Sequence, residues 1–199
     1  MRTLIAIGGG SFQKGETRKI DEYAISRCNS EKPKVLFLGA ASRDDQGYAK
    51  RFKQYYRSLG CEVEALRLLH TKLSDEEIAK KLEEKDLLYL GAGDTTLLME
   101  QLEAHQLIEV IRKQYEHGLV VCGLSAGANV LFNQGYSQSE EGFSLVDGMH
   151  LIEGVFCPHY QKEERKGFDV LDTGSIRKIG CVDKAAFVKE EDKEFFLEG

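Results

Sequence analysis

The sequence GLSAG at residues 123–127 places Ser125 between two glycines, directly after the apolar residues 119–122. A serine on a sharp strand-to-helix turn can act as a nucleophile, and small flanking residues let the strained turn pack against its neighbours. The bare G-x-S-x-G pattern is common by chance. A predicted strand before it, and a predicted helix after it that includes Val130 and Leu131, favour the nucleophile over a tight turn with a buried serine.

A serine hydroxyl needs a base to accept its proton, and histidine is the usual one. Of the five histidines, His70, His105 and His117 fit surface positions or the ends of elements. His159 follows a proline at the end of a predicted strand, where the proline restricts the chain to an extended approach. We expect His159 to be the base, with His150 as the alternative.

The third group should be a carboxylate that orients the imidazole ring. Glu140 lies in a polar loop, where it could equally serve solubility, and Asp183 lies between two apolar segments, where it could equally be a hairpin-turn residue. The sequence does not choose between them.

An oxyanion also needs backbone N–H donors. Ala126, directly after the serine, can supply one, and Gly93 of the loop Gly91-Ala92-Gly93 can supply another. Asp94 then fits the N-cap of a helix that begins at Thr95.

The order of elements predicts one α/β domain over residues 1–199. Short apolar runs alternate with helical patterns, which is typical of parallel strands joined by helical crossovers. The helical pattern of residues 95–115 is expected to break near His105. The expected strands of the parallel part are 3–7, 34–38, 62–66, 87–90 and 119–122, and later strands are expected at 144–152, 154–157, 180–188 and 194–197, with a helical stretch at 163–171. The sequence therefore predicts a three-layer, mostly parallel sheet with extra C-terminal strands.

Loops of small residues follow four of the predicted strands, and the carboxyl ends of parallel strands share one edge of a sheet, where ligands bind. The first of these loops, Gly8-Gly9-Gly10, lacks the glycine spacing of a dinucleotide or phosphate loop, so nucleotide binding is disfavoured. The four loops begin at Gly8, Gly39, Gly91 and Gly123.

Composition argues against several classes of partner. The 199 residues carry a net charge of −6 without a basic block, which disfavours nucleic acid and anionic membranes. No apolar stretch approaches the ~20 residues of a membrane span. Five scattered cysteines indicate reduced thiols, and so we expect a cytoplasmic protein. No metal-ligand spacing is present, and neither a metal nor another cofactor is expected.

In their order, five motifs resemble the peptidase E (aspartyl dipeptidase) family of serine peptidases, which includes the cyanophycinases. The resemblance covers nearly the whole chain and implies a flavodoxin-like α/β/α fold related to class I glutamine amidotransferases. It implies Ser125 as nucleophile and His159 as base. Glu140 stands where the family has a functional Asp and Asp183 where it has a Glu, so the acid stays open. The motifs are IGGG at 7–10, GAAS at 39–42, GAGDT at 91–95, GLSAGAN at 123–129 and CPHY at 157–160.

The resemblance also bears on the substrate. Arg165 matches a family arginine suited to an N-terminal Asp side chain, although a surface arginine paired with Asp169 is an equal alternative. Asp94 replaces a family Asn, where it would repel a substrate carboxylate or bind an α-amino group.

We therefore expect a serine exopeptidase acting on short peptides, as a monomer or small homo-oligomer. The alternatives are a binding or regulatory module without turnover, and an esterase or amidase.

Overall fold

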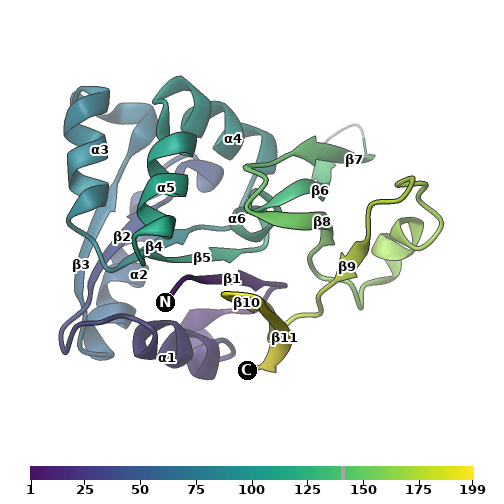
Figure 1. Ribbon diagram of the computed structural model, residues 1–199, viewed down its shortest axis with the longest axis horizontal. Helices are drawn as coiled ribbons and strands as arrows, with labels where there is room; N and C mark the ends of the chain where they lie inside the picture. The colour runs from purple at the N-terminus through teal and green to yellow at the C-terminus, as the bar shows by residue number, and fades with distance from the viewer. Residues whose placement is uncertain (140–141) are drawn as a thin grey trace.

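Five parallel strands make up most of the larger sheet in the computed structural model, which describes residues 1–139 and 142–199 (Figure 1). Two antiparallel strands extend the sheet beside β1, and the strand order is β11-β10-β1-β5-β4-β2-β3. The first four strands have the predicted bounds, and the fifth is shifted by one to two residues. The strands are β1 (Thr3–Ile7), β2 (Lys34–Leu38), β3 (Glu62–Leu66), β4 (Leu87–Leu90), β5 (Val120–Leu124), β10 (Ala185–Glu190) and β11 (Lys193–Glu198).

Helices cover both faces of this sheet, because successive side chains of a strand point to opposite faces and both faces are apolar. In β1, Leu4 and Ala6 join one core, whereas Ile5 and Ile7 join the other. Figure 1 shows α1 below the sheet and α3 and α5 above it. The three-layer prediction is thus confirmed. The helices are α1 (Arg18–Ser26), α2 (Gln46–Ser58), α3 (Asp75–Glu83), α4 (Thr95–Ala104), α5 (Leu107–Glu116) and α6 (Ala126–Asn129).

Local signals set the ends of several helices. Ser74 and Glu77 form a reciprocal capping box at the start of α3, and Asp94 caps α4 by accepting a hydrogen bond from the Leu97 N–H. The predicted break near His105 is confirmed, because Gln106 adopts a left-handed backbone (φ 55°) between α4 and α5. No helix within the described residues is both long enough and apolar enough to cross a bilayer.

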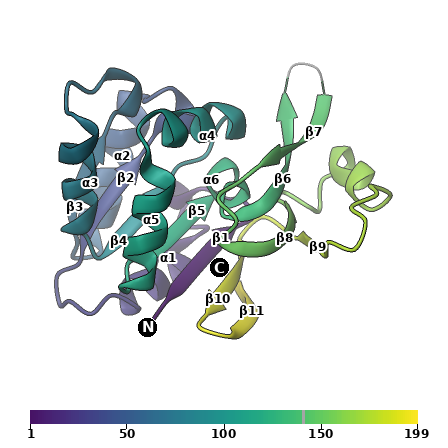
Figure 2. The same ribbon diagram turned by 45° about the horizontal axis from the view of Figure 1, so that its top comes forward.

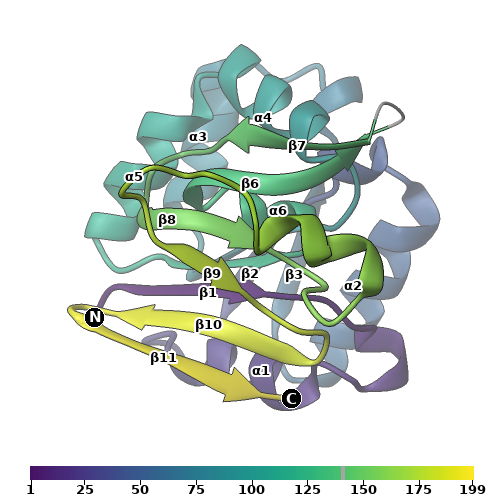
Figure 3. The same cartoon turned by 90° about the vertical axis from the view of Figure 1, so that its right-hand side faces the viewer.

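A second sheet of four strands packs over the β10 end of the larger sheet (Figures 2 and 3). The Phe132 ring stacks on Phe156 within this second sheet and contacts Phe187 of β10, with ring centroids 4.6 and 5.9 Å apart. This packing fixes the second sheet above β1. Its strands, in the order β7-β6-β8-β9, are β6 (Phe132–Ser139), β7 (Gly142–Asp147), β8 (Ile152–Cys157) and β9 (Lys178–Gly180).

The part of the chain after Ser125 departs from the sequence prediction in several places. The predicted strand 144–152 is correct only for residues 144–147, because β7 ends at Asp147 and the Gly148 N–H donates a hydrogen bond to the Asn133 carbonyl. The predicted strand 180–188 is divided by a turn at residues 181–184. The helix after Ser125 ends at Asn129, before the predicted Val130 and Leu131. The helical stretch predicted at 163–171 is a shorter 3₁₀ helix, Glu163–Phe168.

One carboxyl group lies wholly inside the α1 and α2 layer. Asp21 is fully buried and accepts hydrogen bonds from Thr17 Oγ1, Tyr55 OH and Tyr56 OH at 2.7–2.9 Å. Burial outweighs these three donors and raises the pKa of Asp21 from 3.8 to about 6. The folded protein therefore binds this proton more tightly than the unfolded chain does.

We predict that Asp21 makes stability fall as pH rises. A raised folded pKa gives a contribution that is complete below about pH 4 and lost as pH rises through about 6, amounting to about 3 kcal/mol. Urea unfolding at several pH values should show the wild type losing stability relative to Asp21→Asn across this range. A difference between the two proteins that does not change with pH would contradict the prediction.

Candidate active site

Ser125 lies on a strained turn between β5 and α6. Its backbone has φ 52° and ψ −103°, which is unusual for a residue with a side chain and costs about 1–3 kcal/mol. The flanking glycines permit this turn, because a Cβ on Gly123 would overlap the Gly127 carbonyl and a Cβ on Gly127 would overlap the Leu90 carbonyl. The GLSAG segment therefore has the strand-turn-helix form that presents a serine above a sheet.

Three consecutive carbonyl groups at the end of β1 hold the three segments around this serine. The Ile7 carbonyl accepts a hydrogen bond from the Ser125 N–H (2.9 Å). The Gly8 carbonyl accepts one from the His159 N–H (2.9 Å), and the Gly9 carbonyl accepts one from the Lys184 N–H (3.0 Å). One short stretch of backbone thus brings together the ends of β5 and β8 and the turn before β10.

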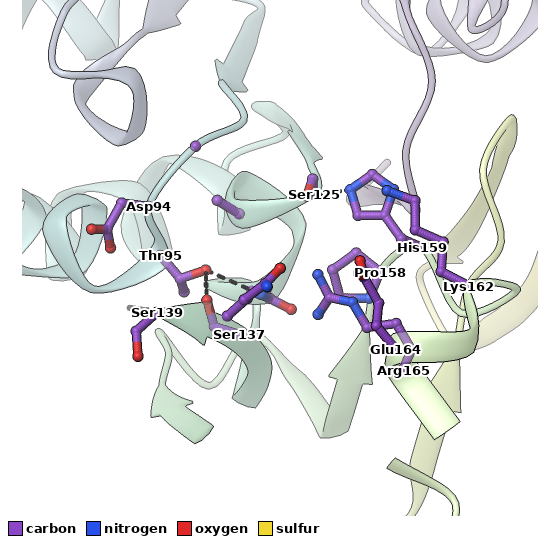
Figure 4. A pocket seen from close by; sticks show the side chains of 14 residues that line it. Asp94, Thr95, Ser125, Ser137, Ser139, Pro158, His159, Lys162, Glu164 and Arg165 are labelled. Carbon is purple, nitrogen blue, oxygen red and sulfur yellow. Dashed lines mark hydrogen bonds between the residues drawn. The ribbon is translucent and has the colours of Figure 1, made fainter. Parts of the chain in front are cut away.

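The side chains of these segments form a continuous line of hydrogen bonds. Ser125 Oγ lies 2.9 Å from His159 Nε2, and His159 Nδ1 lies 2.5 Å from Asp183 Oδ1. An ionised carboxylate only accepts, so Nδ1 carries the proton and Nε2 is free to accept the serine proton. Figure 4 shows the Ser125 side chain facing the His159 ring.

The alternative histidine does not reach the serine. His150 is exposed and its Nδ1 lies 2.7 Å from Asn133 Nδ2. His105 contacts Asp75 and the Leu68 carbonyl instead. Of the two candidate acids, Asp183 contacts His159, whereas Glu140 lies outside the described residues.

Burial lowers the pKa of His159 below its ordinary value of 6.5. The hydrogen bond and negative charge of Asp183 act in the opposite direction, and the positive charges of Lys162 and Arg165 lower the pKa further. The ring is therefore held in its neutral, proton-accepting form at neutral pH.

A cleft of about 530 Å³ opens beside Ser125 and His159 (Figure 4). Its walls come from the loop after β4, from α6, from β6 and from the segment after β8. In Figure 4, Asp94 and Thr95 lie on one side of the cleft and Lys162 and Arg165 on the other. The lining residues are Gly93, Asp94, Thr95, Ser125, Ala126, Asn129, Ser137, Gln138, Ser139, Pro158, His159, Lys162, Glu164 and Arg165.

Arg165 is buried rather than on the surface, being only 6% exposed. Its Nη1 donates to the Tyr136 carbonyl (2.9 Å), and its guanidinium carbon lies 4.6 Å from the centre of the Phe143 ring. The alternative pairing with Asp169 is wrong, because Asp169 accepts from the Tyr160 hydroxyl instead. Within residues 1–139 and 142–199, no carboxylate forms an ion pair with this guanidinium.

The predicted oxyanion donors, Gly93 and Ala126, both line the cleft together with Ser125. Ala126 is the first residue of α6, so its N–H has no acceptor within the helix. Gly93 has φ 142°, and a Cβ there would overlap the Ala41 carbonyl, so the close approach of this loop requires glycine. Asp94 caps α4, as the sequence suggested, and also lines the cleft.

Several residues of the site were not identified from the sequence. Thr95 Oγ1 accepts from Asn129 Nδ2 (3.1 Å) and from Ser137 Oγ (2.8 Å), and these contacts form a polar wall of the cleft. Gln161 bonds both the backbone and the side chain of Asp183. Gly9 allows close packing, because a Cβ there would overlap both His159 and Asp183. The sequence carries only two weak signals for these contacts. Gly9 follows a predicted central strand, and Gln161 lies two residues after His159.

A serine on a strained elbow of an α/β sheet, in line with a histidine and a carboxylate, is the arrangement of the serine hydrolases of α/β type. Residues 4–181 match the family described as Peptidase family S51. The chain therefore belongs to this family and is a serine-type peptidase.

Similar proteins agree with this assignment. The Bacillus subtilis (strain 168) protein "Uncharacterized peptidase YgaJ" is 32% identical over 174 residues, which cover 86% of this chain and 75% of the relative. Peptidase E of Haemophilus influenzae (strain ATCC 51907) is 33% identical over 96 residues, 48% of this chain and 41% of the relative. The crystal structure of a peptidase from an acI-B1 Actinobacterium has a TM-score of 0.74 at 22% identity, covering 100% of this chain and 88% of that chain, and bears on the fold alone.

We predict that the His159 ring titrates below 6.5, because burial opposes its positive charge. Following the ring proton resonances by NMR across pH 4–8 would measure this midpoint. In Asp183→Asn the midpoint should fall further, since the hydrogen bond and charge that raise it are reduced. A wild-type midpoint above 6.5 would show that the Asp183 interaction outweighs burial.

Proposed function

We propose that this peptidase is a serine exopeptidase that removes an acidic first residue from short peptides, with Ser125, His159 and Asp183 as its catalytic triad. The observation that carries the proposal is the line of hydrogen bonds from Ser125 Oγ through His159 to Asp183 Oδ1. The relatives named peptidase E and "Probable alpha-aspartyl dipeptidase" (Drosophila melanogaster) support the choice of a short, acidic substrate.

In the proposed reaction, Ser125 Oγ attacks the carbonyl carbon of the first peptide bond while His159 Nε2 accepts the hydroxyl proton. His159 then donates that proton to the leaving amine, and an acyl-enzyme remains. A water molecule, deprotonated by the same ring, hydrolyses the acyl-enzyme and restores the serine. Asp183 keeps the Nδ1 proton in place and stabilises the imidazolium ion that forms twice in this cycle.

The proposed oxyanion donors are the N–H groups of Ala126 and Gly93. Both belong to backbone that packing holds in one conformation, so little reorganisation accompanies the appearance of negative charge. Their support is their shared position beside Ser125 in the cleft.

Arg165 is the proposed ligand for the acidic side chain of the substrate. No carboxylate of residues 1–139 and 142–199 pairs with this buried guanidinium, which is costly, and an anion entering the cleft would compensate its charge. Asp94, on the other side of the cleft, is the proposed acceptor for the α-ammonium group. An N-terminal aspartate carries both charges: a side-chain carboxylate for Arg165 and an α-ammonium group for Asp94.

We place the protein in the cytoplasm, as a monomer or a small homo-oligomer. Four of its five free cysteines are buried, a pattern typical of reducing compartments.

We predict that the purified protein hydrolyses Asp-X dipeptides and that Ser125→Ala lowers kcat/KM by about 10⁴-fold or more. Chromatographic assay of a panel of Asp-X, Ala-X and ester substrates would measure this, and wild-type protein should also react with a fluorophosphonate probe at Ser125. Labelling of Ser125 together with hydrolysis of esters but not of peptides would favour the alternative that the protein is an esterase. The absence of both labelling and hydrolysis would favour a binding module.

We further predict that Arg165→Met lowers kcat/KM for Asp-X peptides by about 100-fold and leaves Ala-X hydrolysis nearly unchanged, because only the acidic substrate loses a charged partner. Arg165→Lys should restore part of the loss. Arg18→Met, at an exposed arginine on α1, is the matched control and should have no effect. Equal losses on both substrates would show that Arg165 acts on the fold rather than on specificity.

A further inference from the structure

Gln161 forms two reciprocal hydrogen bonds with one residue. Its Nε2 donates to Asp183 Oδ2 (2.5 Å), and its Oε1 accepts from the Asp183 N–H (2.9 Å). The carboxamide thus bonds the backbone and the side chain of Asp183 at once, while Asp183 Oδ1 faces His159 Nδ1.

We propose that Gln161 is a positioning residue that orients the Asp183 carboxylate toward His159. The proposal rests on the proposed function, in which Asp183 is the triad acid. It adds a fourth residue to the line Ser125–His159–Asp183, one that does not line the cleft beside the serine.

We call the two hydrogen bonds from Gln161 to Asp183 a clamp. The need for this clamp follows from the location of Asp183. The residue lies in the turn of residues 181–184 between β9 and β10, and its side chain is 29% exposed. A partly exposed carboxylate on a turn can rotate and exchange its partners for water. Two hydrogen bonds to a single side chain fix both the position of the turn and the rotation of the carboxylate, leaving one oxygen for His159.

Gln161 lies close to His159 in the chain, so the clamp links the segment of His159 to the turn of Asp183. Gln161 is two residues after His159, and the backbone of this segment is tied to the turn before β10, because the Tyr160 N–H donates to the Cys181 carbonyl (3.1 Å). The short segment 159–161 therefore carries His159 and also bonds the turn that carries Asp183.

A neutral amide also suits the chemistry better than a cation would. Lys162 and Arg165 already place positive charge near His159 and lower its pKa, and Asp183 is the negative group that acts in the opposite direction. Lys184, next to Asp183, pairs with Glu16 instead (3.2 Å). A donor without charge orients Asp183 but leaves its full negative charge to stabilise the imidazolium ion.

The test compares Gln161→Met, which keeps the length of the side chain but forms neither hydrogen bond, with Gln54→Met, a matched change at an exposed glutamine on α2. For Gln161→Met we expect a fall of about 10- to 100-fold in kcat with KM unchanged, and an equal fall in the rate of fluorophosphonate labelling. The His159 titration followed by NMR should move to lower pH. Gln54→Met should match the wild type.

A double-mutant cycle identifies the route of the effect. In the Asp183→Ala background, Gln161→Met should change neither the labelling rate nor the His159 titration, because no carboxylate remains at residue 183 for Gln161 to orient, although the backbone N–H can still donate to Gln161. An equal loss in both backgrounds, or a lowered melting temperature with unchanged labelling and titration, would overturn the positioning role.

The NMR measurement separates this inference from the proposed function, since it needs no turnover. If the wild type neither labels nor hydrolyses peptides, the proposed function fails. A shift of the His159 titration in Gln161→Met would still establish the clamp, and an unchanged titration would reject it.

Discussion

The site depends on the main chain at the end of β1, where the carbonyl groups of Ile7, Gly8 and Gly9 each hold a different segment. Parallel strands alone would deliver only the serine and its loop neighbours to this edge of the sheet. The antiparallel direction of β10 brings its beginning, and with it the preceding turn, to the end of β1, where Ile7 pairs with Ala186. The second sheet adds the end of β8. Three separate segments of the chain thus converge on three consecutive peptide groups.

Close packing of the main chain against neighbouring carbonyl groups and side chains explains why glycine is so frequent here. Gly9 lies against the His159–Asp183 pair, Gly93 against the Ala41 carbonyl, and Gly127 against the Leu90 carbonyl. At each place a Cβ would occupy space that another group already fills. The strained backbone of Ser125 is maintained because β5 is buried along its whole length between β1 and β4, so the turn has no alternative path.

The charges of the cleft act on the base as well as on the proposed substrate. Burial lowers the pKa of His159, and the positive charges of Lys162 and Arg165 lower it further, which keeps the ring neutral and able to accept the serine proton. The same cations stand on the side of the cleft proposed to receive an acidic side chain. In the proposed reaction, a carboxylate bound there would reduce their positive field at His159 and so favour the imidazolium ion at the stage at which it must form.

The sequence by itself determined the parallel strands β1 to β4 with their bounds, the capping of α4 by Asp94, and the choice of Ser125 and His159 as candidate nucleophile and base, because periodicity, capping residues and glycine patterns act over a few neighbours. It did not determine which acid faces His159, that Arg165 is buried beneath the Tyr136 carbonyl, or that Gln161 bonds Asp183. These contacts join residues more than twenty positions apart. They exist because β10 runs antiparallel to β1 and the second sheet packs above it, and only the tertiary structure decides such long-range pairings.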